Sequence, residues 1–256
     1  MKPCARAQIM SHGPTLIGSG LNSRTLALLF AVSLWPIAGH AQDPLITLPQ
    51  NYRSVLDNSA VAVIRAHYGA HEKIPVHDHS SFSTVFVYLN DSGPVRIDHA
   101  EETPVSVVRP PTVKGSYRVA AGQAERHSIE NLGDTSSDFL RVELKQVSLD
   151  LKDPFRGKAP QDLSHNQDAV EFTAPGLQIE RMICIGPASC PIRPTTAPSL
   201  VIAFTPSSLA TGPSAKAEKL DAGAVRWVPS SQVIVIAPDT TSPSHILRIL
   251  LPAAPK

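Results

Sequence analysis

Apolar residues occur in short runs separated by turn-forming residues, and no stretch sustains the 3.6-residue period of an amphipathic helix. The runs are rich in β-branched and aromatic side chains, which favour strands. Clear examples are 61–64 (VAVI), 85–88 (VFVY), 105–108 (VSVV) and 139–144 (FLRVEL). Residues 90–93 (NDSG) have the composition of a turn. The pattern therefore predicts an all-β protein.

The second half of the chain repeats the first half in faded form. Segment 74–77 (IPVH) matches 190–193 (CPIR), and each precedes an apolar strand, at 85–88 or 201–204. Two successive all-β units, each a sandwich or a barrel, are therefore expected. We place the first unit at 42–152, a polar linker at 153–168 and the second unit at 169–256.

The N-terminus has the pattern of a signal peptide. Arg24 precedes an apolar run at 26–38, which is too short to span a bilayer, and Gly39 and Ala41 stand at positions −3 and −1 of a cut before Gln42. We expect residues 1–41 to be removed by cleavage after Ala41. The mature protein is then periplasmic or secreted and carries no membrane segment.

Charge limits the classes of partner. The chain has 23 Lys plus Arg against 22 Asp plus Glu, a formal charge of +1. Residues 1–41 contain three of the basic residues and no acidic one, so the mature balance is 20 − 22 = −2. A net charge this close to zero does not predict a basic surface that would bind nucleic acid. The expected partner is a small-molecule ligand or substrate, with a homodimer as an open alternative.

The mature chain keeps two of the three cysteines, Cys184 and Cys190. In an oxidising compartment this pair is suited to a disulfide across a short turn. The alternative is two separate small buried side chains. Both interpretations remain open from the sequence.

Histidines are concentrated in the first unit. His77 and His79 are two residues apart, so on a strand both imidazoles face the same side of the sheet and suit adjacent positions around one metal ion. His127 precedes another predicted strand and is the candidate third ligand. The alternative is two surface histidines. His67 and His71 are expected at the rim or surface.

The segments around these histidines resemble the two motifs of the cupin superfamily. In the first motif a Gly, a short spacer and HxH are followed by a Glu. Gly69 opens the corresponding segment here, but the spacer to His77 is longer than usual, and Ser83 or Thr84 stands where Glu is expected. The second motif, a Gly followed by His and Asn, corresponds to His127 and Asn131, with Ala124 in place of the Gly.

This resemblance implies a bicupin, that is, two tandem cupin-type jelly-roll barrels. It also implies a divalent metal, Fe, Mn, Ni or Zn, bound by His77, His79 and His127. Without the Glu, three neutral imidazoles leave the ion its full charge and open positions for an anionic substrate and O₂. The expected activity is that of a metal-dependent oxidoreductase of dioxygenase type. A non-catalytic ligand-binding or structural cupin with a vestigial site is the alternative.

The second barrel is expected to be degenerate. Aligning Pro191 with Pro75 puts Arg193 and Thr195 at the positions of His77 and His79, and a protonated guanidinium cannot bind a metal. His245 precedes an apolar strand, and we expect it to be exposed.

Overall fold

The computed structural model describes residues 43–100, 103–186, 189–192, 195–212, 216–238 and 242–251. The predicted signal peptide lies outside these residues. No helix within the described ranges is long and apolar enough to cross a membrane. The elements of the first half are α1 (Pro44–Thr47), β1 (Tyr52–Asp57), β2 (Val61–Tyr68), β3 (Lys73–His79), β4 (Ser83–Tyr88), β5 (Val95–His99), β6 (Val105–Arg109), β7 (Tyr117–Ala120), β8 (Glu125–Asn131), β9 (Ser137–Leu144) and β10 (Phe155–Gly157).

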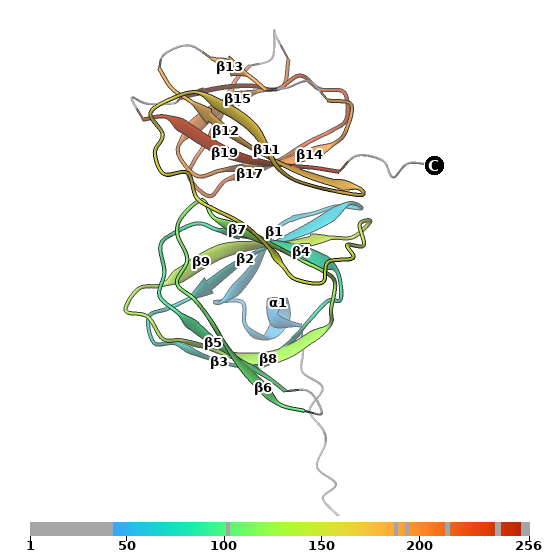
Figure 1. The fold of residues 1–256 in the computed structure, drawn as a ribbon, viewed down its shortest axis with the longest axis vertical. Coiled ribbons are helices and arrows are strands. Elements are labelled where there is room, and N and C mark those ends of the chain that lie inside the picture. Colours follow the sequence, from blue (N-terminus) through green and yellow to red (C-terminus); the bar gives the residue numbers. More distant parts are fainter. Residues whose placement is uncertain are drawn as a thin grey trace, which may run out of the picture. The chain divides into compact units, whose positions relative to one another are not determined.

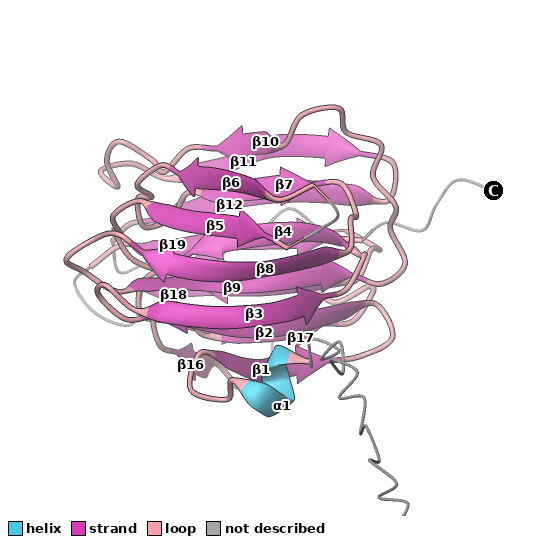
Figure 2. Ribbon diagram, turned by 90° about the horizontal axis from the view of Figure 1, so that it is seen from below, coloured by secondary structure: helices cyan, strands magenta, loops and turns pink. Residues whose placement is uncertain are grey.

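Two sheets face each other in the first half and enclose its interior (Figure 1). One sheet has the strand order β1-β2-β9-β4-β7-β10, and the other has the order β3-β8-β5-β6. Figure 2 shows the second of these sheets face-on, with α1 beside β1. Strand β10 lies within the predicted linker and extends the first sheet by pairing with β7.

The second half follows the same plan. Its strands are β11 (Gln167–Ala174), β12 (Leu177–Cys184), β13 (Cys190–Pro191), β14 (Ser199–Ala203), β15 (Ser207–Ala210), β16 (Glu218–Leu220), β17 (Val225–Val228), β18 (Val235–Pro238) and β19 (Ser244–Leu250). They form sheets of order β11-β12-β19-β14-β17 and β13-β18-β15-β16. Apart from β10, which has no counterpart among the described residues of the second half, this is the strand order of the first half. The predicted fold class, all-β with two barrels, is therefore confirmed.

Side-chain alternation along the central strands produces three apolar clusters. On β2, Val61 and Val63 join a cluster that contains residues of both barrels, whereas Ile64 and Ala66 face the interior of the first barrel. A third cluster fills the interior of the second barrel. Because these central strands are buried on both faces, they appear in the sequence as continuous apolar runs.

The structure corrects the expectation for His245, which is only 4% exposed. Its Nε2 accepts a hydrogen bond of 2.6 Å from Arg181 Nη1, and its ring lies 4.5 Å from that of Phe204. Strand β19 is buried along its whole length, so no position on it is open to solvent.

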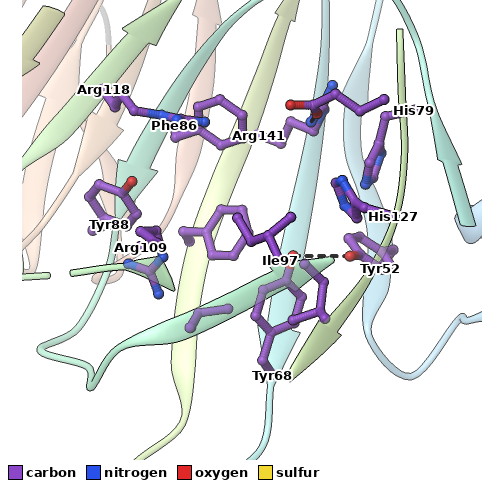
Figure 3. Close-up of a pocket in the computed structure, with 14 residues that line it drawn as sticks. Tyr52, Tyr68, His79, Phe86, Tyr88, Ile97, Arg109, Arg118, His127 and Arg141 are labelled. Atoms are coloured by element: carbon purple, nitrogen blue, oxygen red, sulfur yellow. Dashed lines mark hydrogen bonds and ion pairs between the residues drawn. The ribbon is translucent and has the colours of Figure 1, made fainter. Parts of the chain in front are cut away.

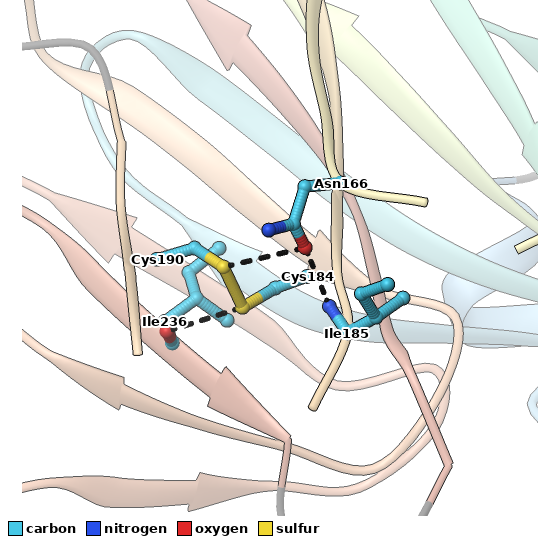
Figure 4. The surroundings of a disulfide bond; sticks show 5 residues. All are labelled: Asn166, Cys184, Ile185, Cys190 and Ile236. Atoms are coloured by element: carbon cyan, nitrogen blue, oxygen red, sulfur yellow. Dashed lines mark hydrogen bonds between the residues drawn. A yellow bond between two sulfur atoms is a disulfide. The ribbon is translucent and has the colours of Figure 1, made fainter. Parts of the chain in front are cut away.

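Cys184 and Cys190 form a disulfide (Figure 4), which settles the alternative left open by the sequence. The bond joins the end of β12 to β13. The Asn166 side chain accepts a 2.8 Å hydrogen bond from the backbone N–H of Ile185, inside the loop that the disulfide closes.

Candidate metal centre

The three predicted histidines lie together inside the first barrel. His77 on β3 is directly opposite His127 on β8, and His79 is opposite Glu125. One ring nitrogen from each of the three histidines lies within 4.8 Å of the others. The i, i+2 spacing on one strand and the register of its neighbour thus produce the proximity that the sequence predicted.

A β-bulge explains how His77 enters the interior. Ile74 pairs with Ile129, and the next pair is His77 with His127, so β3 has one residue more than β8 between these pairs. Proline lacks the N–H that a ladder needs and is tolerated at bulges, and Pro75 lies at this one. Pro75 and Val76, the two residues between these pairs on β3, face solvent, while Ile74 and His77 are buried.

Hydrogen bonds fix the tautomer of His77. Its Nδ1 lies 2.8 Å from the carbonyl oxygen of Pro75, which can only accept, so Nδ1 carries the proton. Nε2 therefore has a free lone pair, and the Tyr52 hydroxyl donates to it at 2.8 Å. The Tyr68 hydroxyl lies 3.0 Å from that of Tyr52 and donates to it in turn. A carbonyl behind the ring is the arrangement that orients metal-binding histidines.

The three imidazoles are neutral at neutral pH, which is the form that binds metals. Burial lowers the pKa of His127 to about 4. Burial also lowers the pKa of His77, and burial together with the Arg141 charge holds the pKa of His79 well below its usual value. The Nδ1 atom of His127 is buried without a hydrogen-bond partner in the described structure. These residues fit a divalent ion, because their rings are neutral, one nitrogen of each lies close to those of the others, and one buried ring nitrogen of His127 has no hydrogen-bond partner.

A cavity of about 50 Å³ adjoins the histidines (Figure 3). Aromatic and aliphatic side chains form most of its wall, and three arginines reach it. The residues that line it are Tyr52, Tyr68, His79, Phe86, Tyr88, Val95, Ile97, Arg109, Arg118, Glu125, His127, Ile129, Phe139 and Arg141.

Arg141, beside the histidines, is neutralised by two carboxylates. Its Nη1 donates to Glu125 at 2.8 Å, and its Nε donates to Glu143 at 2.9 Å. Burial alone would raise the pKa of Glu125, but the Arg141 charge and hydrogen bond reverse the shift and lower it. Glu125 is therefore ionised beside His79, although the motif places its carboxylate elsewhere in the sequence.

His67 and His71 lie outside the histidine cluster. Half or more of each side chain is exposed, and each pairs with an aspartate, His67 with Asp138 and His71 with Asp134, both at 2.9 Å. The expectation that both histidines lie at the rim or surface agrees with this placement.

One residue beside the histidines and several residues of the cavity were not found from the sequence. His99 on β5 is opposite His127, with ring centroids 5.6 Å apart, and Tyr52, Arg109 and Arg118 come from three further strands. Only His99 carried a signal, because its chemical type matches the ligands. The others come from strands of two different sheets, and local periodicity does not encode how these sheets face each other.

The second barrel has no equivalent cluster among the residues described. Cys190 pairs with Ile236 as Ile74 pairs with Ile129, so Ile234 takes the position of His127. Ile234 is 1% exposed and belongs to the apolar interior. Arg193 lies outside the described residues. The apolar filling at Ile234 agrees with the expected degeneration.

No protein-family model matches the chain, and no curated protein matches its sequence. Solved structures do match it. AerE from Microcystis aeruginosa is 14% identical with a TM-score of 0.57, over 79% of this chain and 97% of that one. An oxalate decarboxylase is 11% identical with a TM-score of 0.57, over 78% of this chain and 72% of that one.

A salicylate 1,2-dioxygenase mutant from Pseudoaminobacter salicylatoxidans, solved in complex with gentisate, is 11% identical with a TM-score of 0.50. The match covers 75% of this chain and 69% of that one. These neighbours are cupin-fold proteins, and one of them is a dioxygenase. The chain described here therefore has the two-barrel cupin fold, as its sequence motifs suggested.

Proposed function

We propose that this protein is a metal-dependent oxidoreductase of dioxygenase type that acts on a small molecule in its first barrel. His77, His79 and His127 hold the divalent ion, which is Fe, Mn, Ni or Zn. The observation that carries the proposal is the convergence of three neutral imidazoles beside a buried cavity. The dioxygenase among the structural neighbours supports the reaction class through the fold alone.

The residues around the three histidines have different roles in the proposed reaction. A divalent ion bound by the three histidines would supply Lewis-acid and redox chemistry. His77 is held in the metal-binding tautomer by Pro75, and the aromatic wall excludes water from the reacting groups. Glu125 and Arg141 fix the local charge beside His79.

Metal analysis of protein purified without chelator tests this proposal. We expect about one divalent ion per chain, because one barrel keeps its ligands. Replacing His77, His79 or His127 by Ala should lower metal affinity by at least the 10–100-fold that loss of an outer-shell partner costs. His67→Ala and His71→Ala are matched controls and should keep the wild-type content.

Reconstitution with Fe(II) then tests the reaction class. We expect O₂ consumption in the presence of substrate, and its loss in all three ligand variants. Unchanged metal content in the triple variant would contradict the site. Metal binding without turnover would favour the alternative of a non-catalytic or structural cupin.

We also propose that the protein is exported. The disulfide between Cys184 and Cys190 supports an oxidising compartment. N-terminal sequencing of the periplasmic and culture fractions should find Gln42 as the first residue. Intact residues 1–41 on a cytosolic protein would refute the proposal.

A further inference from the structure

Two arginines of the cavity have no carboxylate partner among the described residues. Arg109 lies at the end of β6, and Arg118 lies on β7. Arg109 donates through Nη2 to Ser137 Oγ at 3.1 Å, but its Nη1 is buried without a partner. Arg118 likewise has a buried Nε without a partner. Buried donors of this kind are rare in native proteins and require a reason.

The arginines are held in place by aromatic rings rather than by acids. The guanidinium carbon of Arg118 lies 4.3 Å from the centre of the Phe86 ring, and that of Arg109 lies 5.3 Å from the centre of the Tyr88 ring. Stacking occupies the flat faces of a guanidinium and leaves its N–H edge free. Figure 3 shows both arginines beside Tyr88, with His79 and His127 at the other end of the group.

The charges around the cavity do not balance. Arg109, Arg118 and Arg141 contribute three positive charges, while the two carboxylates on Arg141 contribute two negative ones, which leaves 3 − 2 = +1. A divalent ion on three neutral histidines adds two more positive charges. An uncompensated buried charge is costly, so the occupied cavity requires an anion.

We propose that Arg109 and Arg118 bind the carboxylate of a small organic acid, whose other end points toward the three histidines. This inference deepens the proposed function by naming its substrate class. Two planar guanidiniums with free N–H donors match the two oxygens of a carboxylate. Phe86, Ile97 and Phe139 give the cavity an apolar wall, which favours an organic acid over inorganic phosphate or sulfate. The volume of about 50 Å³ limits the ligand to a few heavy atoms.

Calorimetric titration with propanoate tests the proposal on the metal-loaded and on the chelator-treated protein. Propanoate should bind in a one-to-one ratio, whereas propanamide, its neutral analogue, should not bind. Arg109→Gln and Arg118→Gln should each weaken binding by about tenfold or more, because each removes a charge-assisted hydrogen bond. Arg96→Gln is the matched control, since Arg96 on β5 is paired with Glu130. All three variants should keep the wild-type metal content.

Thermal unfolding distinguishes a ligand-binding arginine from a structural one. Replacing Arg118 by Gln removes a buried unpaired charge, so the melting temperature of the ligand-free protein should stay the same or rise. Arg141→Gln should lower it by several degrees, because Glu125 and Glu143 would lose their partner. At one concentration, propanoate should raise the melting temperature of the wild type more than that of Arg118→Gln.

The outcomes separate this proposal from the metal site. Metal binding without propanoate binding would overturn the carboxylate site and leave the metal site intact. Propanoate binding that depends on Arg118 in a protein that takes up no metal would support the carboxylate site and refute the proposed function. Equal binding of propanamide, or displacement of propanoate by sulfate at equal concentration, would overturn the assignment to an organic acid.

Discussion

At the scale of single residues, the hydrogen-bond partners of His77 decide how that ligand can bind a metal ion. The Pro75 carbonyl sets the tautomer of His77, and the Tyr52 hydroxyl occupies the nitrogen that a metal would use. Burial raises the pKa of Tyr52 well above its ordinary value and that of Tyr68 to about 12, so both are neutral phenols. The Tyr52 hydroxyl therefore competes with a metal ion for the lone pair of His77 Nε2.

Tyr52→Phe should consequently increase metal affinity. The variant loses one hydrogen bond to His77, whose net contribution is about 0.5–1.5 kcal/mol, so affinity should rise by roughly 2- to 12-fold. Competition with a fluorescent chelator measures the change. Tyr68→Phe is the control, because its hydroxyl does not contact His77. A fall in affinity would instead show that the Tyr52 oxygen helps to hold the ion.

At the scale of elements, β8 carries His127 and ends at Asn131. The side chain of Asn131 links several backbone segments through hydrogen bonds. Asn131 is fully buried, and its Nδ2 lies within 3.2 Å of the carbonyl oxygens of Tyr68, Gly69 and Thr135. Its Oδ1 accepts from the N–H of Gly133 at 3.0 Å. The Asn of the second motif therefore acts by closing the turn after β8.

Asn131→Ala should lower the free energy of unfolding by roughly 3 kcal/mol, because buried carbonyls lose their donor. Asn131→Asp should cost at least as much, since it replaces that donor by a charged acceptor. Urea unfolding measures both. Wild-type stability in Asn131→Asp would contradict this role.

The elements also show how far the sequence could be interpreted. The runs 61–64 and 139–144 lie within β2 and β9, and HxH placed His77 and His79 on one face because strand alternation is local. Arg109 and Arg118 could not be assigned, since Arg109 on β6 and Arg118 on β7 belong to different sheets, and the sequence does not show how the two sheets face each other. The expectation that His245 is exposed was wrong. Tertiary packing covers both faces of its strand, and the sequence alone does not reveal this.

At the scale of the whole molecule, the described residues from 43 to 251 belong to one compact unit, and one of its apolar clusters contains residues of both barrels. His245 and Arg181 are polar residues within this tightly packed part of the chain. Burial lowers the pKa of His245 to about 3, and the nearby charges of Arg181 and Lys114 add to the effect. The folded protein therefore keeps His245 neutral where the unfolded chain, with a pKa of 6.5, would protonate it.

This difference makes His245 a source of acid sensitivity. Between pH 6.5 and 3 the unfolded chain binds the extra proton, so the free energy of unfolding falls as the pH decreases through this window. His245→Gln keeps an acceptor for Arg181 and should make that pH dependence shallower by up to about 1.4 kcal/mol per pH unit. Urea unfolding at several pH values measures the slope, with the exposed His165→Gln as control. Equal slopes in wild type and His245→Gln would refute this assignment.

Because the strand order is duplicated, the second barrel can serve as an internal comparison for the first. One scaffold occurs twice in the same chain, once around histidines and arginines and once around Ile192, Ile234 and Ile236. The same strand arrangement therefore forms around a partly polar interior in the first barrel and around an apolar interior in the second. Grafting imidazoles onto the second copy would turn the comparison into an experiment in design, with the first copy as the template.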